Sequence, residues 1–158
     1  VYEFMKTPPS TPFVWQIAND YRKFVKKNKI FHDKKFLYEL LYFDWIEVEV
    51  EMKEYKETKQ SKFSWDNSYK LAPSARVKKF KYDIINKDYE TNRENEVLFR
   101  EINQFIYVLI QRLNKKESLE KTLKTLCKEN DLELQDAKDA LEEALKELIS
   151  QDALLISK

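Results

Sequence analysis

The sequence of 158 residues contains no glycine, although average usage of about 7% would supply roughly eleven. The Walker loop and the dinucleotide-binding loop both need glycine, because the backbone must approach a phosphate closely. The absence of glycine therefore excludes these nucleotide-binding classes. Tight turns in this chain must use other residues, and Asn and Asp tolerate the necessary backbone conformations best.

Cysteine and histidine are almost absent, with Cys127 and His32 as the single examples. One cysteine cannot form an internal disulfide, so a reducing cytoplasm is the simplest setting. Zinc fingers and His-based iron sites need several such ligands, and we therefore expect neither a metal nor another cofactor. Cys127 follows Leu126 on an apolar stripe, which predicts a core position. His32 stands beside Asp33 at a helix start, where local capping is the simplest role.

The sequence also lacks long apolar runs and a net charge. No apolar run approaches 18 residues, so no segment is expected to span a bilayer. The first ten residues do not have the pattern of a signal peptide. Because 29 Lys and Arg residues stand against 28 Asp and Glu residues, no overall field favours nucleic acid or an anionic membrane. Apolar residues make up 42% of the chain, which is enough to build the hydrophobic core of one domain or of two small ones.

Residues 36–55 carry the clearest periodic pattern in the chain. Their apolar side chains recur at steps of three and four, which predicts an amphipathic helix. Asp33 is the expected N-cap, since its carboxylate can accept bonds from the first free backbone N–H groups. Residues 45–50 (WIEVEV) also alternate with the period of a strand. The continuing helical spacing through Met52 favours the helix.

The rest of the N-terminal half is predicted as a helix over residues 12–27 and a polar connecting loop over residues 56–72. Three aromatic residues should pin that loop to the core: Phe63, Trp65 and Tyr69. Pro73 marks a boundary, which divides the chain into a helical module (1–72) and a second module (73–158).

The second module combines strand-like and helical patterns. Residues 77–85 and 96–102 are predicted as a β-hairpin around the Asn- and Asp-rich turn. Three helices are then predicted, over residues 103–113, 118–127 and 134–149, and residues 153–156 could add a short strand. This order is typical of a winged-helix-like module with a small antiparallel sheet. The predicted fold class is α+β, mainly α.

Five segments of the sequence together resemble a known family. They are Ser-Thr-Pro-Phe-Val with Ile17 in residues 10–17, Phe-Leu-Tyr-Glu-Leu with Asp-Trp in residues 36–45, Leu-Ala-Pro at 71–73, Val-Leu-Phe-Arg-Glu-Ile-Asn at 97–103 and Ser-Leu-Glu-Lys-Thr-Leu at 118–123. The chain is similar to a bacterial DNA-binding-domain family. That family includes the partner subunits of multinuclear non-haem iron oxidases in ribosomal-peptide maturation (RiPP biosynthesis), as in methanobactin biosynthesis.

The resemblance implies a division of labour between two proteins. The oxidase, a TIM-barrel protein, would hold the iron and perform the chemistry, while the accessory subunit docks on it and helps to hold the precursor peptide. Members of the family usually carry further N-terminal helices. We therefore expect residues 1–72 to lack upstream helices, and the start at Val1 agrees with that expectation.

DNA binding requires cations on the helix that enters the major groove. The expected recognition helix, residues 134–149, instead carries five acidic residues against two lysines: Asp136, Asp139, Glu142, Glu143 and Glu147 against Lys138 and Lys146. Two basic runs lie elsewhere: Arg76, Lys78, Lys79 and Lys81, and Lys26, Lys27 and Lys29. Such runs are most often solvated surface, so DNA remains possible but is disfavoured.

Peptide capture is the second candidate activity. An open strand edge can accept an extended peptide through backbone hydrogen bonds, and we place this site at Val97, Phe99 and Arg100. The alternative is that this strand is already paired or covered. Trp65 and Tyr69, in the predicted loop, could act as anchors at a protein interface.

Three carboxylates, Asp44, Glu47 and Glu51, share a face of the predicted central helix. A catalytic pair or a metal cluster is conceivable there, but a solvated acidic face is the simpler interpretation. We therefore expect a non-catalytic accessory protein that binds an iron oxidase and its precursor peptide. The alternatives are a winged-helix transcription regulator that binds DNA and a carboxylate-metal enzyme.

Overall fold

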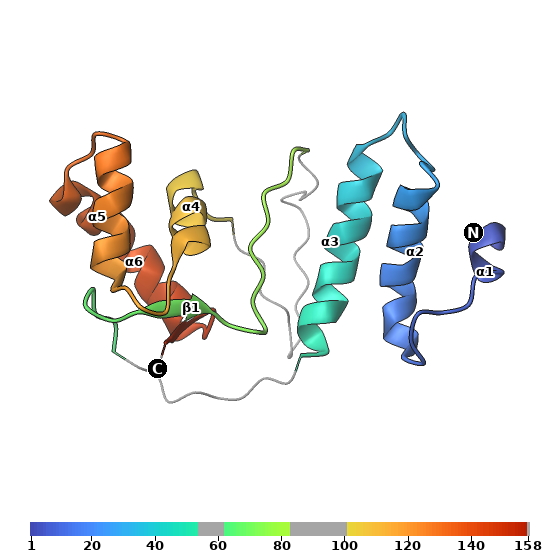
Figure 1. Ribbon diagram of the computed structural model, residues 1–158, viewed down its shortest axis with the longest axis horizontal. Helices are drawn as coiled ribbons and strands as arrows, with labels where there is room; N and C mark the ends of the chain where they lie inside the picture. The colour runs from blue at the N-terminus through green and yellow to red at the C-terminus, as the bar shows by residue number, and fades with distance from the viewer. Residues whose placement is uncertain (54–61, 83–100, 158) are drawn as a thin grey trace. The chain divides into compact units, whose positions relative to one another are not determined.

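The computed structural model describes residues 1–53, 62–82 and 101–157 (Figure 1). These residues form two compact units. The first contains residues 1–52 with 78–82, and the second contains residues 62–77 with 101–157. The sequence instead places the division at residue 73.

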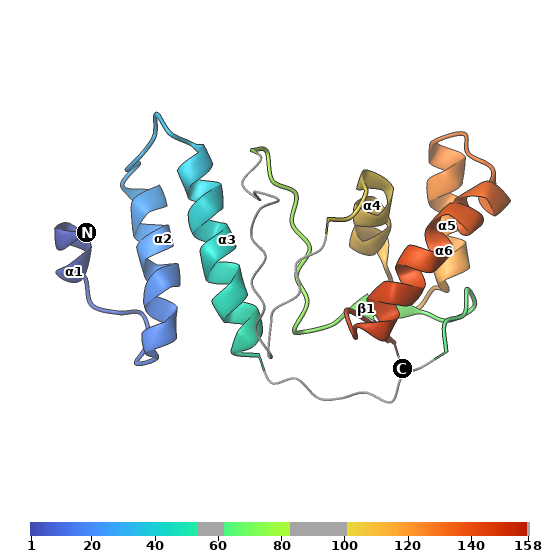
Figure 2. The ribbon, with the colours of Figure 1, turned by 180° about the vertical axis from the view of Figure 1, so that it is seen from behind.

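The first unit is helical in its described part. It contains α1 (Tyr2–Met5), a 3₁₀ turn η1 (Val14–Gln16), α2 (Ile17–Lys27) and α3 (Phe36–Glu51). Figures 1 and 2 both show α2 and α3 side by side, joined by a tight connection. That connection uses Lys29 at φ 52° and Phe31 at φ 63°. Glycine normally takes such left-handed positions, and this chain has none to place there.

The prediction for residues 36–55 is confirmed in type and in its first residue, and it is corrected at the N-cap and at the C-terminal end. Residues 45–50 are helical and not a strand. The expected N-cap is wrong: Lys35 occupies that position, and no side chain caps the helix. Asp33 lies inside the preceding turn, in which the Lys34 amide donates to the Phe31 carbonyl at 2.9 Å. The α-helix ends at Glu51, and residues 54 and 55 lie outside the described residues.

The helix predicted over residues 12–27 begins later than expected. Phe13 is extended, with φ −82° and ψ 115°, and the 3₁₀ turn η1 leads into α2 at Ile17. The start of the helix is held by Asp20, whose carboxylate accepts bonds from the Ser10 amide at 2.8 Å and the Ser10 hydroxyl at 2.6 Å. These contacts tie the N-terminal segment to the first turn of α2.

The second unit contains β1 (Tyr69–Leu71), α4 (Gln104–Arg112), α5 (Leu119–Glu129), α6 (Leu134–Ser150) and β2 (Leu154–Ile156). The three predicted helices and the tail strand are therefore confirmed within two residues at each end. Asn103 and Ser118 cap α4 and α5 through their side-chain oxygens.

The sheet is built differently from the prediction. β1 pairs with β2 in antiparallel register, Tyr69 opposite Ile156 and Leu71 opposite Leu154. β1 lies in the segment that was predicted as a loop. The sequence did not reveal this strand, because a run of three residues is too short to show a period. Residues 77–82 and 101–102 are not strands, which corrects the predicted hairpin there, and its remaining residues lie outside the described part. Across the described residues the chain is mainly helical with a small antiparallel sheet.

The core of the second unit is aliphatic and continuous. Side chains from β1, α4, α5, α6 and β2 are almost completely buried, including Tyr69, Leu109, Leu123, Leu145 and Leu154. Full burial of one leucine contributes about 1.5–3 kcal/mol, so this set dominates the stability of the unit. In the described residues, no helix has both the length and the apolar character needed to cross a membrane.

Candidate functional site

The outward face of α6 carries three exposed acidic residues. Leu141, Leu145, Leu148 and Ile149 turn one side of this helix into the core. The opposite side exposes Asp136, Asp139 and Glu143, which recur at steps of three and four and therefore share one face. We refer to these three residues as the α6 acidic face.

Neither lysine of α6 neutralises the acidic face. Lys138 forms an ion pair with Glu120 of α5, and its ammonium group lies 5.5 Å from the centre of the Trp65 ring. Lys146 pairs with Glu142 and lies 5.8 Å from the centre of the Phe63 ring. Both cations are thus directed toward the segment before β1, and the acidic face keeps its negative charge.

The ion pair with Lys146 is the main reason why the pKa of Glu142 lies below its usual value, and the Trp65 indole adds to this effect. Glu142 and Lys146 therefore lie on the part of α6 that is next to the loop before β1.

Trp65 and Tyr69, the two expected interface anchors, are both held within the second unit. The Trp65 ring meets Phe63 edge-on at 5.1 Å and is partly buried. Tyr69 is only 1% exposed. Its hydroxyl accepts from the Ser64 amide at 3.0 Å and donates to the Ser64 carbonyl at 3.2 Å. Burial leaves Tyr69 no surface for a partner, whereas part of Trp65 is accessible.

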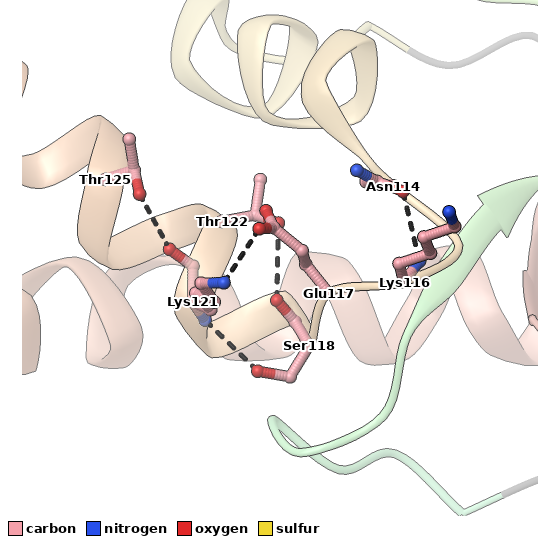
Figure 3. Close-up of polar contacts among 7 residues, drawn as sticks. All are labelled: Asn114, Lys116, Glu117, Ser118, Lys121, Thr122 and Thr125. Carbon is pink, nitrogen blue, oxygen red and sulfur yellow. Dashed lines mark hydrogen bonds and ion pairs between the residues drawn. The ribbon is translucent and has the colours of Figure 1, made fainter.

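The N-terminus of α5 is closed by the chain itself (Figure 3). The Ser118 hydroxyl accepts from the Lys121 amide at 3.3 Å. The next two free donors bond to the loop before β1, the Leu119 amide to Asn67 at 2.9 Å and the Glu120 amide to Trp65 at 3.0 Å. A helix N-terminus binds phosphate through such free N–H groups, and here these donors already have acceptors.

Most lysines of the two basic runs are exposed, whereas Arg76 and Lys78 make contacts within the protein. Lys26, Lys27 and Lys29 are exposed at the end of α2. The guanidinium group of Arg76 donates to the carbonyls of Pro73 and Ala75, and the ammonium group of Lys78 lies 5.2 Å from the centre of the Tyr42 ring. Lys79 and Lys81 are exposed.

The three carboxylates on α3 remain a surface feature. Asp44, Glu47 and Glu51 all reach solvent, and the pKa of Asp44 is raised by partial desolvation. Within the described ranges, no three His, Cys, Asp or Glu side chains are grouped as a metal ion would require.

The other residues singled out from the sequence are the predicted peptide-binding residues, the single cysteine and the single histidine. Val97, Phe99 and Arg100 lie outside the described residues. Cys127 is buried as predicted, and burial raises the pKa of its thiol. His32 is exposed in the turn between α2 and α3.

Sequence reasoning missed a group of polar and aromatic side chains between α2 and α3, centred on Arg22 and Trp45. The spacing of Gln16, Asn19 and Arg22 at steps of three was the available signal, because it places three polar groups on one face of α2. Comparison with protein-family models, curated proteins and solved structures gives no match to this chain.

Proposed function

We propose that this chain is a non-catalytic accessory protein of the bacterial cytoplasm, and that its second unit docks on a protein partner through the α6 acidic face. The family resemblance supplies the identity of the partner: an iron-dependent oxidase together with its ribosomal precursor peptide. The charge on α6 supports protein binding independently of that resemblance, because carboxylates attract the lysine and arginine side chains of a partner.

The observation that carries the proposal is the exposure of Asp136, Asp139 and Glu143 with both α6 lysines paired elsewhere. In a helix-turn-helix, the corresponding surface lies against DNA phosphates and base edges. Three carboxylates there would be repelled by the phosphates. The same face is suited to a partner with basic side chains.

We further propose that the second unit is a variant of the winged-helix fold. Its support is the succession of three helices and a strand, with α6 leading directly into β2. One feature departs from that pattern, because the strand paired with β2 precedes the three helices.

The test is an affinity capture of the tagged chain from its native host, with a high-salt wash and identification by mass spectrometry. We expect an iron oxidase and a short ribosomal peptide among the retained molecules. Neutralising the acidic face with Asp136→Asn, Asp139→Asn and Glu143→Gln should reduce retention of the oxidase at least tenfold, since close interfacial charge pairs contribute about 1.5 kcal/mol or more.

The matched control removes three exposed carboxylates elsewhere: Glu47→Gln, Asp66→Asn and Glu101→Gln. It changes the net charge equally and should retain the oxidase as the unmodified chain does. Equal losses in both variants would show a general charge effect and would contradict the role of the α6 acidic face.

A winged-helix DNA-binding regulator is the second candidate, and the exposed lysines Lys124 and Lys128 on α5 of the second unit favour it. This function predicts duplex binding that weakens steeply with salt. Retention of nucleic acid alone, lost in the high-salt wash, would replace the accessory-protein proposal with this one.

A further inference from the structure

The space between α2 and α3 contains an arginine stacked on two aromatic rings. The guanidinium carbon of Arg22 lies 4.9 Å from the centre of the Trp45 ring and 5.3 Å from that of Tyr42. The two rings meet edge-on at 5.9 Å. Stacking of this kind fixes the plane of the guanidinium group and restricts its rotation.

A polar chain along α2 fixes one edge of the same guanidinium group. Arg22 Nη2 donates to Asn19 Oδ1 at 3.0 Å, and Asn19 Nδ2 donates to Gln16 Oε1 at 3.2 Å. Asn19 is 9% exposed and is one of two buried polar residues in the described part of the chain. Contacts within the protein therefore fix the orientation of the Arg22 guanidinium group in the absence of a ligand.

Two buried donors at this position have no acceptor. Arg22 Nε and Trp45 Nε1 are both shielded from solvent, and nothing in the described chain accepts a hydrogen bond from either atom. A buried donor without an acceptor costs about 1–3 kcal/mol, and more when the donor is charged. Two such donors on facing helices, on side chains that stack against each other, point to a missing acceptor common to both.

Arg22 is itself a cation, and the ammonium group of Lys78 lies 5.2 Å from the centre of the Tyr42 ring. Of the acidic residues on α2 and α3, Asp20 binds Ser10, and Glu39 accepts from the amides of Lys81 and Tyr82. A negatively charged acceptor would therefore be favoured over a neutral one.

We propose that Arg22 and Trp45 form a binding site for a carboxylate group. A carboxylate is planar and has two oxygens, so one can accept from Arg22 Nε and the other from Trp45 Nε1. Arg22 and Trp45 are both half-buried, so this site lies within reach of solvent. The site is independent of the function proposed for the α6 acidic face.

The test is an acetate titration of the ¹⁵N-labelled full chain, followed by the indole N–H signals of its three tryptophans in NMR spectra. We expect the Trp45 signal to shift and saturate. The signals of Trp15 and Trp65 should stay in place, because neither indole is a buried donor without an acceptor in the described part of the chain. Sodium chloride at matched ionic strength serves as the reference titration.

Three variants test whether the effect belongs to this site. Arg22→Lys keeps the charge and removes the planar donor, so the apparent Kd for acetate should rise about tenfold or more, as expected for losing a bond to a charged group. Arg112→Lys, in the second unit, is the matched control and should leave the Kd unchanged. In Trp45→Phe the Arg22 Nε–H signal reports the same titration, again with weakened binding.

Two further ligands identify the source of the carboxylate. A capped peptide with one glutamate presents a side-chain carboxylate, and an acetylated peptide with a free C-terminus presents a terminal one. A saturating Trp45 shift with either supports the site. A shift that does not saturate, an equal response to chloride, or an unchanged Kd in Arg22→Lys would overturn it.

Discussion

At the scale of single residues, two aromatic side chains with polar atoms, Trp65 and Tyr69, attach the loop before β1 to the rest of the second unit. Trp65 combines an edge-on ring contact with Phe63 and a contact between its ring face and the Lys138 ammonium group. Tyr69 places its ring in the core while its hydroxyl closes the loop at Ser64. The sequence predicted that both residues pin this loop to the core, which is confirmed, and it left a role as partner anchors open, because the same residue types serve cores and interfaces.

Tyr69→Phe removes a hydroxyl and leaves the ring in place. The Ser64 amide and carbonyl lose their shared partner, so the free energy of unfolding should fall by about 1–2 kcal/mol. Urea denaturation measures the change. Tyr82→Phe, at a residue 42% exposed, is the control and should alter stability by less than about 0.5 kcal/mol. Equal effects of the two substitutions would contradict the role of the loop hydrogen bonds.

At the scale of elements, the three helices of the second unit and its tail strand could be predicted from the sequence, but β1 and its pairing with β2 could not. The stripes that include Leu109, Leu123 and Leu145 extend over about two and a half turns or more, so their period is visible. β1 and β2 have three residues each and are defined by their pairing, which depends on residues far apart in the chain. The Arg22 and Trp45 site depends on how α2 and α3 face each other, which no single helix pattern contains.

The capping of α5 gives a prediction at this scale. Ser118→Ala removes the oxygen that accepts from the Lys121 amide, and the free energy of unfolding should fall by about 1 kcal/mol (Figure 3). Thermal unfolding followed by circular dichroism measures it. Thr125→Ala removes a hydroxyl from an exposed position of the same helix and should change stability little. A larger loss from Thr125→Ala than from Ser118→Ala would rule out the capping role.

At the scale of the whole molecule, the two units respond to acid in the same direction. Bonds from the side chain and then the backbone of Ser10 hold the pKa of Asp20 low in the first unit, and the bond from Lys146 does so for Glu142 in the second. A carboxyl group with a lowered pKa in the folded state stabilises the protein above its unfolded pKa. That contribution disappears as the pH falls through the folded pKa.

We therefore expect Asp20→Asn to be less stable than the unmodified chain at neutral pH. The difference should shrink as the pH falls below about 4, the ordinary range of carboxyl groups. Urea midpoints measured across this range test it. Asp44→Asn is the contrasting variant, because desolvation raises the pKa of Asp44 and makes its ionised form unfavourable in the folded state. A difference between Asp20→Asn and the unmodified chain that stays constant with pH would contradict the assignment.

The pairing of β1 with β2 also has a consequence for biosynthesis. β1 lies at residues 69–71, but its partner strand lies at residues 154–156, after all three helices of the unit. A ribosome produces the chain from its N-terminus, at about 5–20 residues per second. β1 must therefore wait several seconds for its partner, with the edge that β2 will cover still open. The second unit can complete its sheet only after Ile156 has left the ribosome exit tunnel.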